Sequence, residues 1–420
     1  MTLAQSVGFY RAADGDLVCD GVPLARVVGV EGTPLYVYSA ATLRERFQAL
    51  DAAFGAYPHA LHYALKANST LAIARLMHEL GSAADANSIW ELELARKAGF
   101  KPGDIVFTGV GKSRAELECA VPLALKAINV ESAGELARVE AIAERSGRVA
   151  RVAIRINPDV DAESHPHIST GLKINKFGVP SDDAYELIRT IRDRRALSLV
   201  AIHVHVGSQI TSLEPIRRAA VAVAELVDSL REFAVDLEYV DLGGGLGVSY
   251  DGGAVPSPQA YVETLVNAAR RTGLPIVIEP GRSVAAPAGA LVARVIDIKP
   301  RDASSDFAVI DAGMTELMRP ALYGAFHRIE PVRLRSAGDR QYEIAGPVCE
   351  SSDIVGRNRR LPSLEVGDLL AIRDAGAYGS AMASNYNRRP LPAEVLVDNG
   401  HWRVIRKRQT LEDMLSLESV

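Results

Sequence analysis

Short apolar runs alternate with longer segments of helical periodicity between about residues 33 and 282. Eight runs have the character of strands: 61–67, 82–87, 104–109, 127–132, 151–157, 199–207, 238–244 and 275–281. Between them, stretches such as 132–146, 182–194, 214–233 and 258–272 carry apolar residues at spacings of three and four, which is typical of amphipathic helices. This alternation predicts parallel pairing, in an open doubly wound sheet or in a barrel. The count of eight over roughly 250 residues favours a (β/α)8 TIM-type barrel.

The pattern changes after residue 283. Segments 290–300, 307–313, 340–351, 368–379 and 392–410 have the character of strands joined by turns, without helical spacers. They predict a second, mostly antiparallel β domain, and we expect the similar first 35 residues to complete it. The predicted domains are therefore a barrel over 36–283 and a β domain made of 1–35 with 284–420.

Composition narrows the class of protein. The 420 residues are 48% hydrophobic and carry a net charge of −5, which excludes a disordered chain and argues against nucleic acid or a membrane surface as the main partner. Three widely spaced cysteines predict neither a disulfide framework nor a zinc site. The first residues lack the pattern of a signal peptide, and the apolar stretch 197–206 is too short to span a membrane. We expect a cytoplasmic protein.

Polar residues end several of the predicted strands, and in a barrel these ends share one rim. Lys66 ends the first run and Asp85 lies in the second. Partial desolvation at the rim would make the Lys66 amine a nucleophile towards aldehydes. The alternative is a surface lysine whose amine reaches water.

A glycine turn, Gly243–Gly245, ends the seventh run. Glycines allow a phosphate to approach backbone N–H groups, and Gly281 with Arg282 can add a further N–H and a guanidinium. A flexible turn is the alternative. The full G-x-G-x-x-G pattern is absent, which argues against a dinucleotide site.

Glu279 and two histidines complete the predicted rim. A buried carboxylate needs a partner, either a protonated pyridine nitrogen or a nearby basic side chain. His203 and His205 alternate with valine and so point to the same side of their strand. The flat ring of His205 could stack on a flat cofactor, whereas His203 is better explained as a core residue. No further ligands at metal-binding spacing accompany them, so we predict no metal.

In the β domain, segment 346–353 brings together the thiol of Cys349 and the carboxylates of Glu350 and Asp353. The alternative for Cys349 is a buried structural thiol, which is the usual case. Tyr378 lies among small residues that leave room for a ligand.

Motifs that run through nearly the whole chain resemble one enzyme family. The chain is similar to the diaminopimelate decarboxylases, pyridoxal-phosphate enzymes of the fold type III, alanine-racemase-like class. The segments that carry the resemblance, in the family's order, are 62–68 (HYALKAN), 155–178, 203–210 (HVHVGSQI), 241–247 (DLGGGLG), 279–282 (EPGR), 311–327, 346–353 (GPVCESSD) and 375–398.

The resemblance implies a cofactor site for pyridoxal 5'-phosphate. Lys66 would bind the cofactor covalently, His205 would stack on its ring and Glu279 would pair with its ring nitrogen. The groups expected around the phosphate are Ser208, Gly243, Gly244, Gly245, Gly281, Arg282 and Tyr378. Asp85 also falls in a family segment, but Asn87 and Trp90 depart from the expected pattern, so we leave Asp85 out of the predicted catalytic set.

The resemblance also implies a substrate site shared between two subunits. Arg282, Arg319, Tyr323 and Tyr378 would bind the substrate, with Arg282, Arg319 and Tyr323 on the carboxylate that is retained. Cys349, as proton donor, and Glu350, at the distal amino group, would come from the partner in a homodimer. The implied reaction converts meso-2,6-diaminopimelate to L-lysine and CO2, the last step of lysine biosynthesis.

Other functions remain open on the sequence. Another decarboxylase of the same fold would act on ornithine, arginine or a carboxylated polyamine, and Arg319, Tyr323 and the 349–351 segment argue against it. An alanine racemase has less use for a thiol and a glutamate at a dimer interface. A catalytically silent cofactor-binding homologue would not need both Lys66 and Cys349. A glycosidase-like barrel is the outside alternative, but it would need a matched pair of strand-end carboxylates, and the sequence shows none, since only Glu279 and Asp85 end strands.

Overall fold

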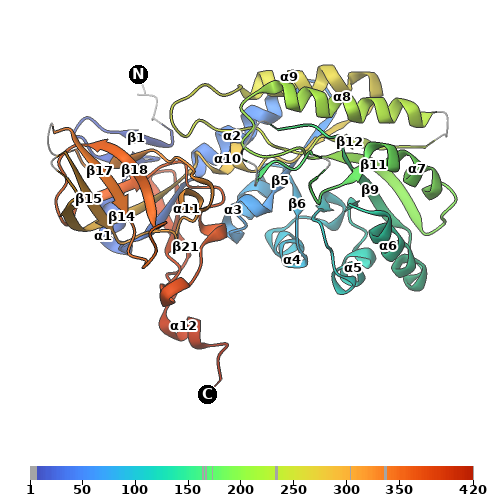
Figure 1. Ribbon diagram of the computed structural model, residues 1–420. Coiled ribbons are helices and arrows are strands. Elements are labelled where there is room, and N and C mark those ends of the chain that lie inside the picture. The colour runs from blue at the N-terminus through green and yellow to red at the C-terminus, as the bar shows by residue number, and fades with distance from the viewer. Residues whose placement is uncertain are drawn as a thin grey trace. The chain divides into compact units, whose positions relative to one another are not determined.

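The structure is a computed structural model that describes residues 7–162, 165, 168–172, 174–231, 235–302, 304–334 and 338–419 (Figure 1). The chain forms two compact units. The barrel unit comprises residues 46–248 and 254–283, and the β unit comprises residues 1–45, 249–253 and 284–420.

Eight parallel strands form a closed ring in the barrel unit. In chain order they are β5 (His59–Ala64), β6 (Ala83–Ala86), β7 (Ile105–Phe107), β8 (Ala127–Val130), β9 (Ala150–Asn157), β11 (Leu197–Val204), β12 (Tyr239–Asp241) and β13 (Ile276–Ile278). β8 pairs with β9 and β13 pairs with β5, which closes the ring. The short β10 (Val179–Pro180) adds to β9. Each predicted run supplies one strand of the ring, and the barrel prediction is confirmed.

Helices follow the strands and lie around them in Figure 1. They are α2 (Ala40–Ala53), α3 (Leu71–Glu79), α4 (Ile89–Ala98), α5 (Arg114–Ala120), α6 (Ala133–Ser146), α7 (Ser181–Ile191), α8 (Leu213–Leu230), α9 (Pro258–Ala269) and α10 (Arg282–Ala285). Within the described residues, no helix is both long enough and apolar enough to cross a membrane.

Local sequence explains where a typical barrel helix begins and ends. At the start of α6 the hydroxyl of Ser132 accepts a hydrogen bond from the backbone N–H of Glu135, and the helix ends at Gly147 with φ of 61°. Both are standard helix-end signals, because they satisfy backbone groups that the helix leaves open. Leu136, Val139 and other apolar residues face inwards, so the helix covers the strands.

The β unit is built on a nine-stranded mixed sheet. Its strands are β4 (Leu35–Ser39), β14 (Gly289–Pro300), β15 (Ser305–Ile310), β16 (Ile329–Pro331), β17 (Arg340–Ala345), β18 (Ile354–Leu361), β19 (Leu369–Ile372), β20 (Ala393–Asp398) and β21 (His401–Arg406). The β15–β17 and β4–β20 pairs are parallel and the others are antiparallel. A small sheet of β1 (Phe9–Arg11), β2 (Leu17–Cys19) and β3 (Val22–Pro23), with α1 (Leu24–Glu31), α11 (Arg319–Tyr323) and α12 (Leu411–Leu415), completes the unit.

The N-terminal boundary of the barrel lies later than predicted. The sequence placed it at 35/36, whereas the structure divides the units at 45/46. The reason is β4, whose five residues are all buried and which pairs with β14 on one side and β20 on the other. An apolar run of this length shows that a strand is buried, but not which sheet it joins.

Candidate active site

Lys66 lies at the carboxyl end of β5, in the 3₁₀ turn Leu65–Ala67. Its Nζ atom lies 2.9 Å from Oδ2 of Asp85 in the neighbouring strand β6. Asp85 is completely buried, whereas the Lys66 side chain keeps 30% of its surface exposed. Asn87 donates a second hydrogen bond, of 3.0 Å, to the same carboxylate oxygen. A buried carboxylate therefore holds an accessible amine at the rim of the barrel.

His205, just beyond β11, presents a neutral ring. The backbone N–H of Gly244 donates to its Nδ1 atom at 3.1 Å, so this nitrogen holds no proton. Burial lowers the pKa of His205 well below its ordinary value, and the positive charges of Lys66 and Arg155 act in the same direction. The side chain is 16% exposed, so it lies at the boundary between the core and the rim.

The glycine turn packs directly against the backbone of Glu279. Gly243 has φ of 66° and Gly245 has φ of 107°, values that favour glycine. A Cβ on Gly244 would lie 2.3 Å from the carbonyl oxygen of Glu279. The backbone N–H of Glu279 in turn donates to the Gly243 carbonyl at 2.8 Å. The turn is thus fixed beside both His205 and Glu279.

Arg282 and Ser208 meet at the same end of the barrel. The guanidinium donates from Nε at 3.2 Å and from Nη2 at 2.9 Å to the hydroxyl oxygen of Ser208. Next to Arg282, a Cβ on Gly281 would come within 3.0 Å of the Cβ of Ala67, so the 279–282 loop lies against the Lys66 turn. A guanidinium beside a hydroxyl is a pair of groups suited to a phosphate or carboxylate.

Glu279, directly after β13, is a buried carboxylate with a histidine beside it. Its Oε1 atom lies 3.4 Å from Nε2 of His203, and both side chains are buried. Among the described residues, neither carboxylate oxygen has a hydrogen-bond partner. Burial by itself would raise the pKa of Glu279, but the charge of His203, with those of Lys66 and Arg155, outweighs it and lowers the pKa to about 2. Glu279 is therefore an anion throughout the physiological range.

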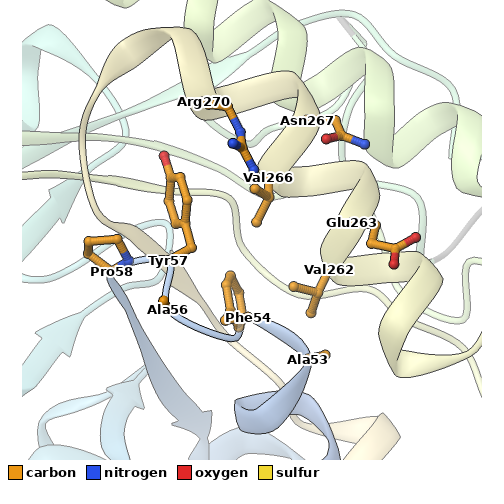
Figure 2. Close-up of a pocket in the computed structure, with 10 residues that line it drawn as sticks. All are labelled: Ala53, Phe54, Ala56, Tyr57, Pro58, Val262, Glu263, Val266, Asn267 and Arg270. Atoms are coloured by element: carbon orange, nitrogen blue, oxygen red, sulfur yellow. The ribbon is translucent and has the colours of Figure 1, made fainter.

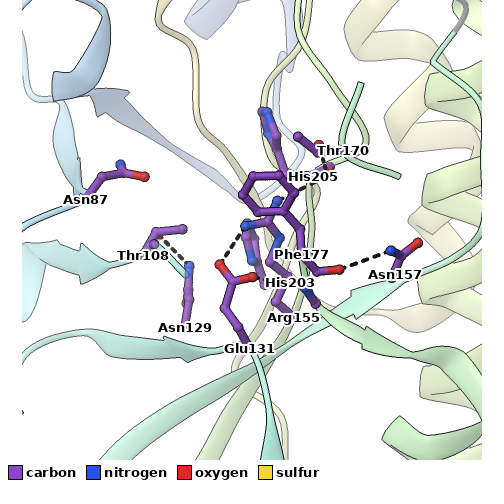
Figure 3. Close-up of polar contacts among 12 residues, drawn as sticks. Asn87, Thr108, Asn129, Glu131, Arg155, Asn157, Thr170, Phe177, His203 and His205 are labelled. Carbon is purple, nitrogen blue, oxygen red and sulfur yellow. Dashed lines mark hydrogen bonds and ion pairs between the residues drawn. The ribbon is translucent and has the colours of Figure 1, made fainter. Parts of the chain in front are cut away.

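A buried ion pair supports the histidine strand (Figure 3). Nη1 of Arg155 on β9 lies 2.6 Å from Oε1 of Glu131, and both residues are buried. The second terminal nitrogen of Arg155, Nη2, lies 3.4 Å from the carbonyl oxygen of His205. The central carbon of the guanidinium, Cζ, lies 4.9 Å from the centre of the Phe177 ring. Glu131 also accepts from the backbone N–H of Gly178 at 2.9 Å. Arg155 and Glu131 therefore tie the segment after β9 to the strand end that carries His205.

Further bonds attach segment 158–178 to the rim, although residues 163, 164, 166, 167 and 173 within it lie outside the described residues. The side chain of Thr170 donates to the His205 carbonyl at 2.7 Å, and the backbone N–H of Ser208 donates to the Ile168 carbonyl at 3.0 Å. Figure 3 shows Asn157 bonded to the carbonyl of Phe177, at 3.0 Å. The segment is thus bonded to the backbone of two predicted cofactor residues, His205 and Ser208.

In the β unit, Arg319 begins α11 and is buried, with the rings of His327 and Tyr250 beside its guanidinium. Its Nη1 atom donates to Nε2 of His327 at 2.8 Å, while Nδ1 of His327 bonds the carbonyl oxygen of Arg373. The guanidinium also lies 4.5 Å from the centre of the Tyr250 ring. Tyr323 ends the same short helix. Tyr250 and His327 were not predicted as site residues, because nothing in the local sequence links them to Arg319.

Cys349 and Glu350 lie on the exposed loop between β17 and β18. Asn387 donates to the sulfur of Cys349 at 3.3 Å, and the hydroxyl of Tyr386 donates to Glu350 at 2.9 Å. Asp353 holds the base of the loop by accepting from the backbone N–H groups of residues 314 and 348, at 2.6 and 2.7 Å. The thiol and the carboxylate are therefore held at the surface rather than packed in the core.

Two segments of the β unit contain non-glycine residues with positive φ. Tyr378, half-buried, has φ of 56°, and Asn387 and the adjacent Arg388 both have φ of 55°. Non-glycine residues in this region are strained and occur often at functional sites.

Comparison with known proteins decides the family. A sequence model of the pyridoxal-binding domain of pyridoxal-dependent decarboxylases matches residues 40–286. A diaminopimelate decarboxylase of Vibrio cholerae is 45% identical over 413 residues, which cover 98% of this chain and 99% of that protein. The chain belongs to the diaminopimelate decarboxylase family.

Solved structures of diaminopimelate decarboxylases have the same fold. The enzyme of Helicobacter pylori, complexed with L-lysine, has a TM-score of 0.91 and 43% identity, covering 94% of this chain and 99% of that one. The enzyme of M. jannaschii has a TM-score of 0.93 and 36% identity, covering 98% of both chains. The chain is accordingly a pyridoxal-phosphate-dependent decarboxylase.

The residues of the barrel unit fit the cofactor of a diaminopimelate decarboxylase. The unsatisfied carboxylate oxygens of Glu279 need a buried cationic donor, which a protonated pyridine nitrogen provides. The Lys66 amine is accessible for an aldehyde, and Ser208 with Arg282 offers donors to a phosphate. The fit thus rests on unpaired buried atoms as well as on residue types.

The predicted site residues fall into two groups. The structure brings together those of the barrel unit: Lys66, His205, Ser208, Gly243, Gly244, Gly245, Glu279, Gly281 and Arg282. Arg319, Tyr323, Cys349, Glu350 and Tyr378 belong to the β unit. Asp85, which is not in the predicted catalytic set, contacts Lys66. Its position in the second apolar run is the sequence feature that could have indicated this contact. Asn87, which departs from the family pattern, donates to the same carboxylate.

A surface pocket of about 450 Å³ lies elsewhere on the barrel unit (Figure 2). It is lined by residues that precede β5, including Phe54 and Tyr57, by one side of α9, including Glu263, and by Arg270 just after that helix. This is the amino end of β5, whereas barrel chemistry occurs at the carboxyl ends of the strands. The pocket contains none of the predicted site residues.

We expect Gly244→Ala to weaken cofactor binding. The new Cβ would meet the Glu279 carbonyl at 2.3 Å, and such overpacking costs about 1–3 kcal/mol, or roughly 5–150-fold in the dissociation constant. Titration of the apoprotein with pyridoxal phosphate measures this. Gly103→Ala is the matched control, because a Cβ there has nothing within 4 Å; equal affinities for the two variants would contradict the expected packing.

Proposed function

We propose that this chain decarboxylates meso-2,6-diaminopimelate to L-lysine and CO2, the last step of lysine biosynthesis. The observation that carries the proposal is the rim of the barrel, where the Lys66 amine lies 2.9 Å from Asp85 and the carboxylate of Glu279 is buried without a hydrogen bond from any described residue. The substrate is supported by the 45% identity to the Vibrio cholerae diaminopimelate decarboxylase over nearly the full length of both chains.

The barrel residues would prepare the cofactor for this reaction. Pyridoxal phosphate, when bound, takes up the electron pair that a departing carboxylate leaves on the α-carbon. Lys66 binds its aldehyde carbon, and Glu279 keeps its ring nitrogen protonated. His205, neutral because Gly244 donates to its Nδ1, packs its flat ring against the pyridine without adding a competing charge. Ser208, Gly243, Gly244, Gly245, Gly281, Arg282 and Tyr378 bind the phosphate.

Residues of the β unit would select the substrate. Arg319 and Tyr323 lie at the two ends of one short helix, and we assign them, with Arg282 and Tyr378, to substrate binding. A planar guanidinium binds a carboxylate by two parallel hydrogen bonds. Clamping the carboxylate that is retained would direct the reaction to the other end of the substrate and fix the orientation of the group that reacts.

The proton that replaces CO2 would come from Cys349, with Glu350 on the distal amino group. We propose that both belong to the partner subunit's half of a homodimeric site. The support is their place on an exposed loop, where Asn387, which has φ of 55°, donates to Cys349 and its neighbour Tyr386 donates to Glu350. The three cysteines are not joined by disulfides, in keeping with a reducing compartment, and we place the reaction in the cytoplasm.

A parallel assay distinguishes this proposal from a decarboxylase of another amino acid. Purified protein with pyridoxal phosphate is mixed with meso-diaminopimelate, ornithine, arginine or lysine, and CO2 and product are measured. We expect lysine and CO2 from meso-diaminopimelate alone, because the Arg319 clamp requires a second carboxylate. A diamine formed from ornithine would keep the fold and cofactor, but overturn the roles given to Arg319, Tyr323 and Glu350.

Replacement of Lys66 tests the covalent site. We expect Lys66→Ala to abolish turnover and the visible absorbance of the bound cofactor, since the variant lacks the amine that bonds the aldehyde. Absorption spectra and CO2 release check both. The control is Lys101→Ala, an exposed lysine outside the site, which should behave like the wild type. Retention of either signal by the Lys66 variant would remove Lys66 from this role.

Replacement of Cys349 tests the proton donor. We expect Cys349→Ala to slow turnover by roughly 10²–10⁴-fold, the usual contribution of a general acid, with little change in cofactor affinity. Cys119→Ala, the other exposed cysteine, is the control and should leave turnover unchanged.

Mixing two inactive variants tests the shared site. If Cys349 acts across a dimer, Lys66→Ala and Cys349→Ala subunits should regain about one quarter of wild-type activity, because half of the dimers are mixed and each mixed dimer has one intact site. Activity is measured after the subunits have been dissociated and reassembled together. No recovery from a mixture that still forms dimers would place Cys349 and Lys66 of each site on one chain.

A further inference from the structure

Three ionisable side chains meet inside the barrel, beneath the rim. His203 on β11 and Asp241 on β12 are direct partners in the strand register, and Glu279 follows the next strand, β13. One ligand atom of each lies within 4.8 Å of the others, and all three residues are buried. The proposed function uses Glu279 and assigns nothing to the other two.

The two oxygens of Glu279 face different surroundings. Oε1 lies 3.4 Å from Nε2 of His203, whereas Oε2 lies 4.0 Å from Nδ1 of His205. That second nitrogen already accepts the N–H of Gly244, so it has no proton to give. Oε1 is therefore the oxygen that contacts His203, and Oε2 remains available to the ring nitrogen of the cofactor.

Asp241 adds a second carboxyl group to the same enclosed space. Its Oδ1 accepts from the backbone N–H of Gly243 at 3.0 Å, while Oδ2 has no hydrogen-bond partner among the described residues. Burial, and then the charge of Glu279, raise the pKa of Asp241 well above its ordinary value. Two carboxyl groups this close in a buried site repel each other when both are ionised, so one of them keeps its proton.

The surrounding charges decide which of the two carboxyl groups, Glu279 or Asp241, keeps its proton. The positive charges of His203, Lys66 and Arg155 act on Glu279, whereas Asp241 experiences the negative charges of Glu279 and Asp85 more strongly than the positive charge of Lys126. Two more imidazoles face the cluster, but His205 and His62 both have lowered pKa values, that of His62 about 4, and are neutral. Glu279 is accordingly the anion.

We propose that Asp241 and His203 are positioning residues for the cofactor: Asp241 remains an uncharged acid, and His203 carries the positive charge that pairs with Glu279. Glu279 is then the single anion of the cluster and offers Oε2 to the ring nitrogen. An ionised Asp241 would compete for that ring proton. A divalent cation bound to the three side chains would need both carboxylates ionised, and would occupy the same oxygen. The inference rests on the proposed cofactor site at Glu279.

The first test is the protonation of Asp241 in the wild-type holoenzyme. With ¹³C-labelled aspartate, the infrared spectrum at pH 7 should contain the C=O stretch of a buried carboxylic acid, and Asp241→Asn should lack it. Absence of the band in an active wild-type enzyme overturns the proposal while leaving the proposed function intact. Failure of the wild-type protein to bind pyridoxal phosphate would instead overturn the proposed function. The test does not require any variant of His203 to fold.

The second test is the pH dependence of His203→Gln. Burial raises the pKa of Glu279, and the imidazolium of His203 lowers it. Without the imidazolium the pKa of Glu279 rises, so Glu279 is protonated at a higher pH as acid is added. We expect the acid limb of kcat, and the pH at which the ring nitrogen of ¹⁵N-labelled cofactor changes its chemical shift, to move up by about one unit or more. Asp241→Asn removes no charge and should leave both where they are.

His62→Gln is the matched control. It also removes a buried imidazole from the barrel, but the imidazole of His62 carries no charge near neutral pH. Its acid limb should coincide with that of the wild type. An equal upward shift in the His62 and His203 variants, or a shift in Asp241→Asn as large as that in His203→Gln, would show that packing rather than charge governs the site and would falsify the assignment.

Discussion

The pairing of β13 with β5 is the contact on which the site depends. It closes the parallel ring and brings the segment after β13 against the turn after β5, where the backbone N–H of Ala64 donates to the carbonyl of Pro280 at 3.1 Å. Lys66 and Glu279, far apart in the chain, thereby reach one rim. Because all strands run in the same direction, His205, the glycine turn and Arg282 arrive at that rim as well.

Several charged side chains at this rim are buried, among them Asp85, Glu131, Arg155 and Glu279. Taking a charge out of water costs several kcal/mol unless a partner offsets it, and removing one member of a buried pair typically costs about 3–5 kcal/mol. Two of the charges described at the rim have opposite partners, Lys66 with Asp85 and Arg155 with Glu131, and Glu279 lies 3.4 Å from the ring of His203. Arg155 also contacts the His205 carbonyl, so the charges that stabilise the rim also hold its groups in place.

The β unit holds its functional groups differently. Arg319 contacts His327 and Tyr250, while Cys349 and Glu350 lie on an exposed loop. The backbone strain at Tyr378, Asn387 and Arg388 is maintained by the fold around them, since such conformations cost of order 1–3 kcal/mol each. In this unit, the candidate site residues lie on loops and on the short helix α11, outside the strands of the mixed sheet.

The amino-acid sequence by itself determined the eight strands of the barrel, because each is a short apolar run followed by a helix with its own end signals. It also indicated Lys66, His205, Gly243–Gly245 and Glu279, because these residues end such runs and the ends of parallel strands share a rim. Only the tertiary structure placed β4 in the mixed sheet, since a buried strand carries no mark of the sheet it joins. It alone joined Asp85 to Lys66 and set the tautomer of His205 through Gly244. Charge and protonation depend on distances between residues remote in the chain, and these exist only once the ring has closed.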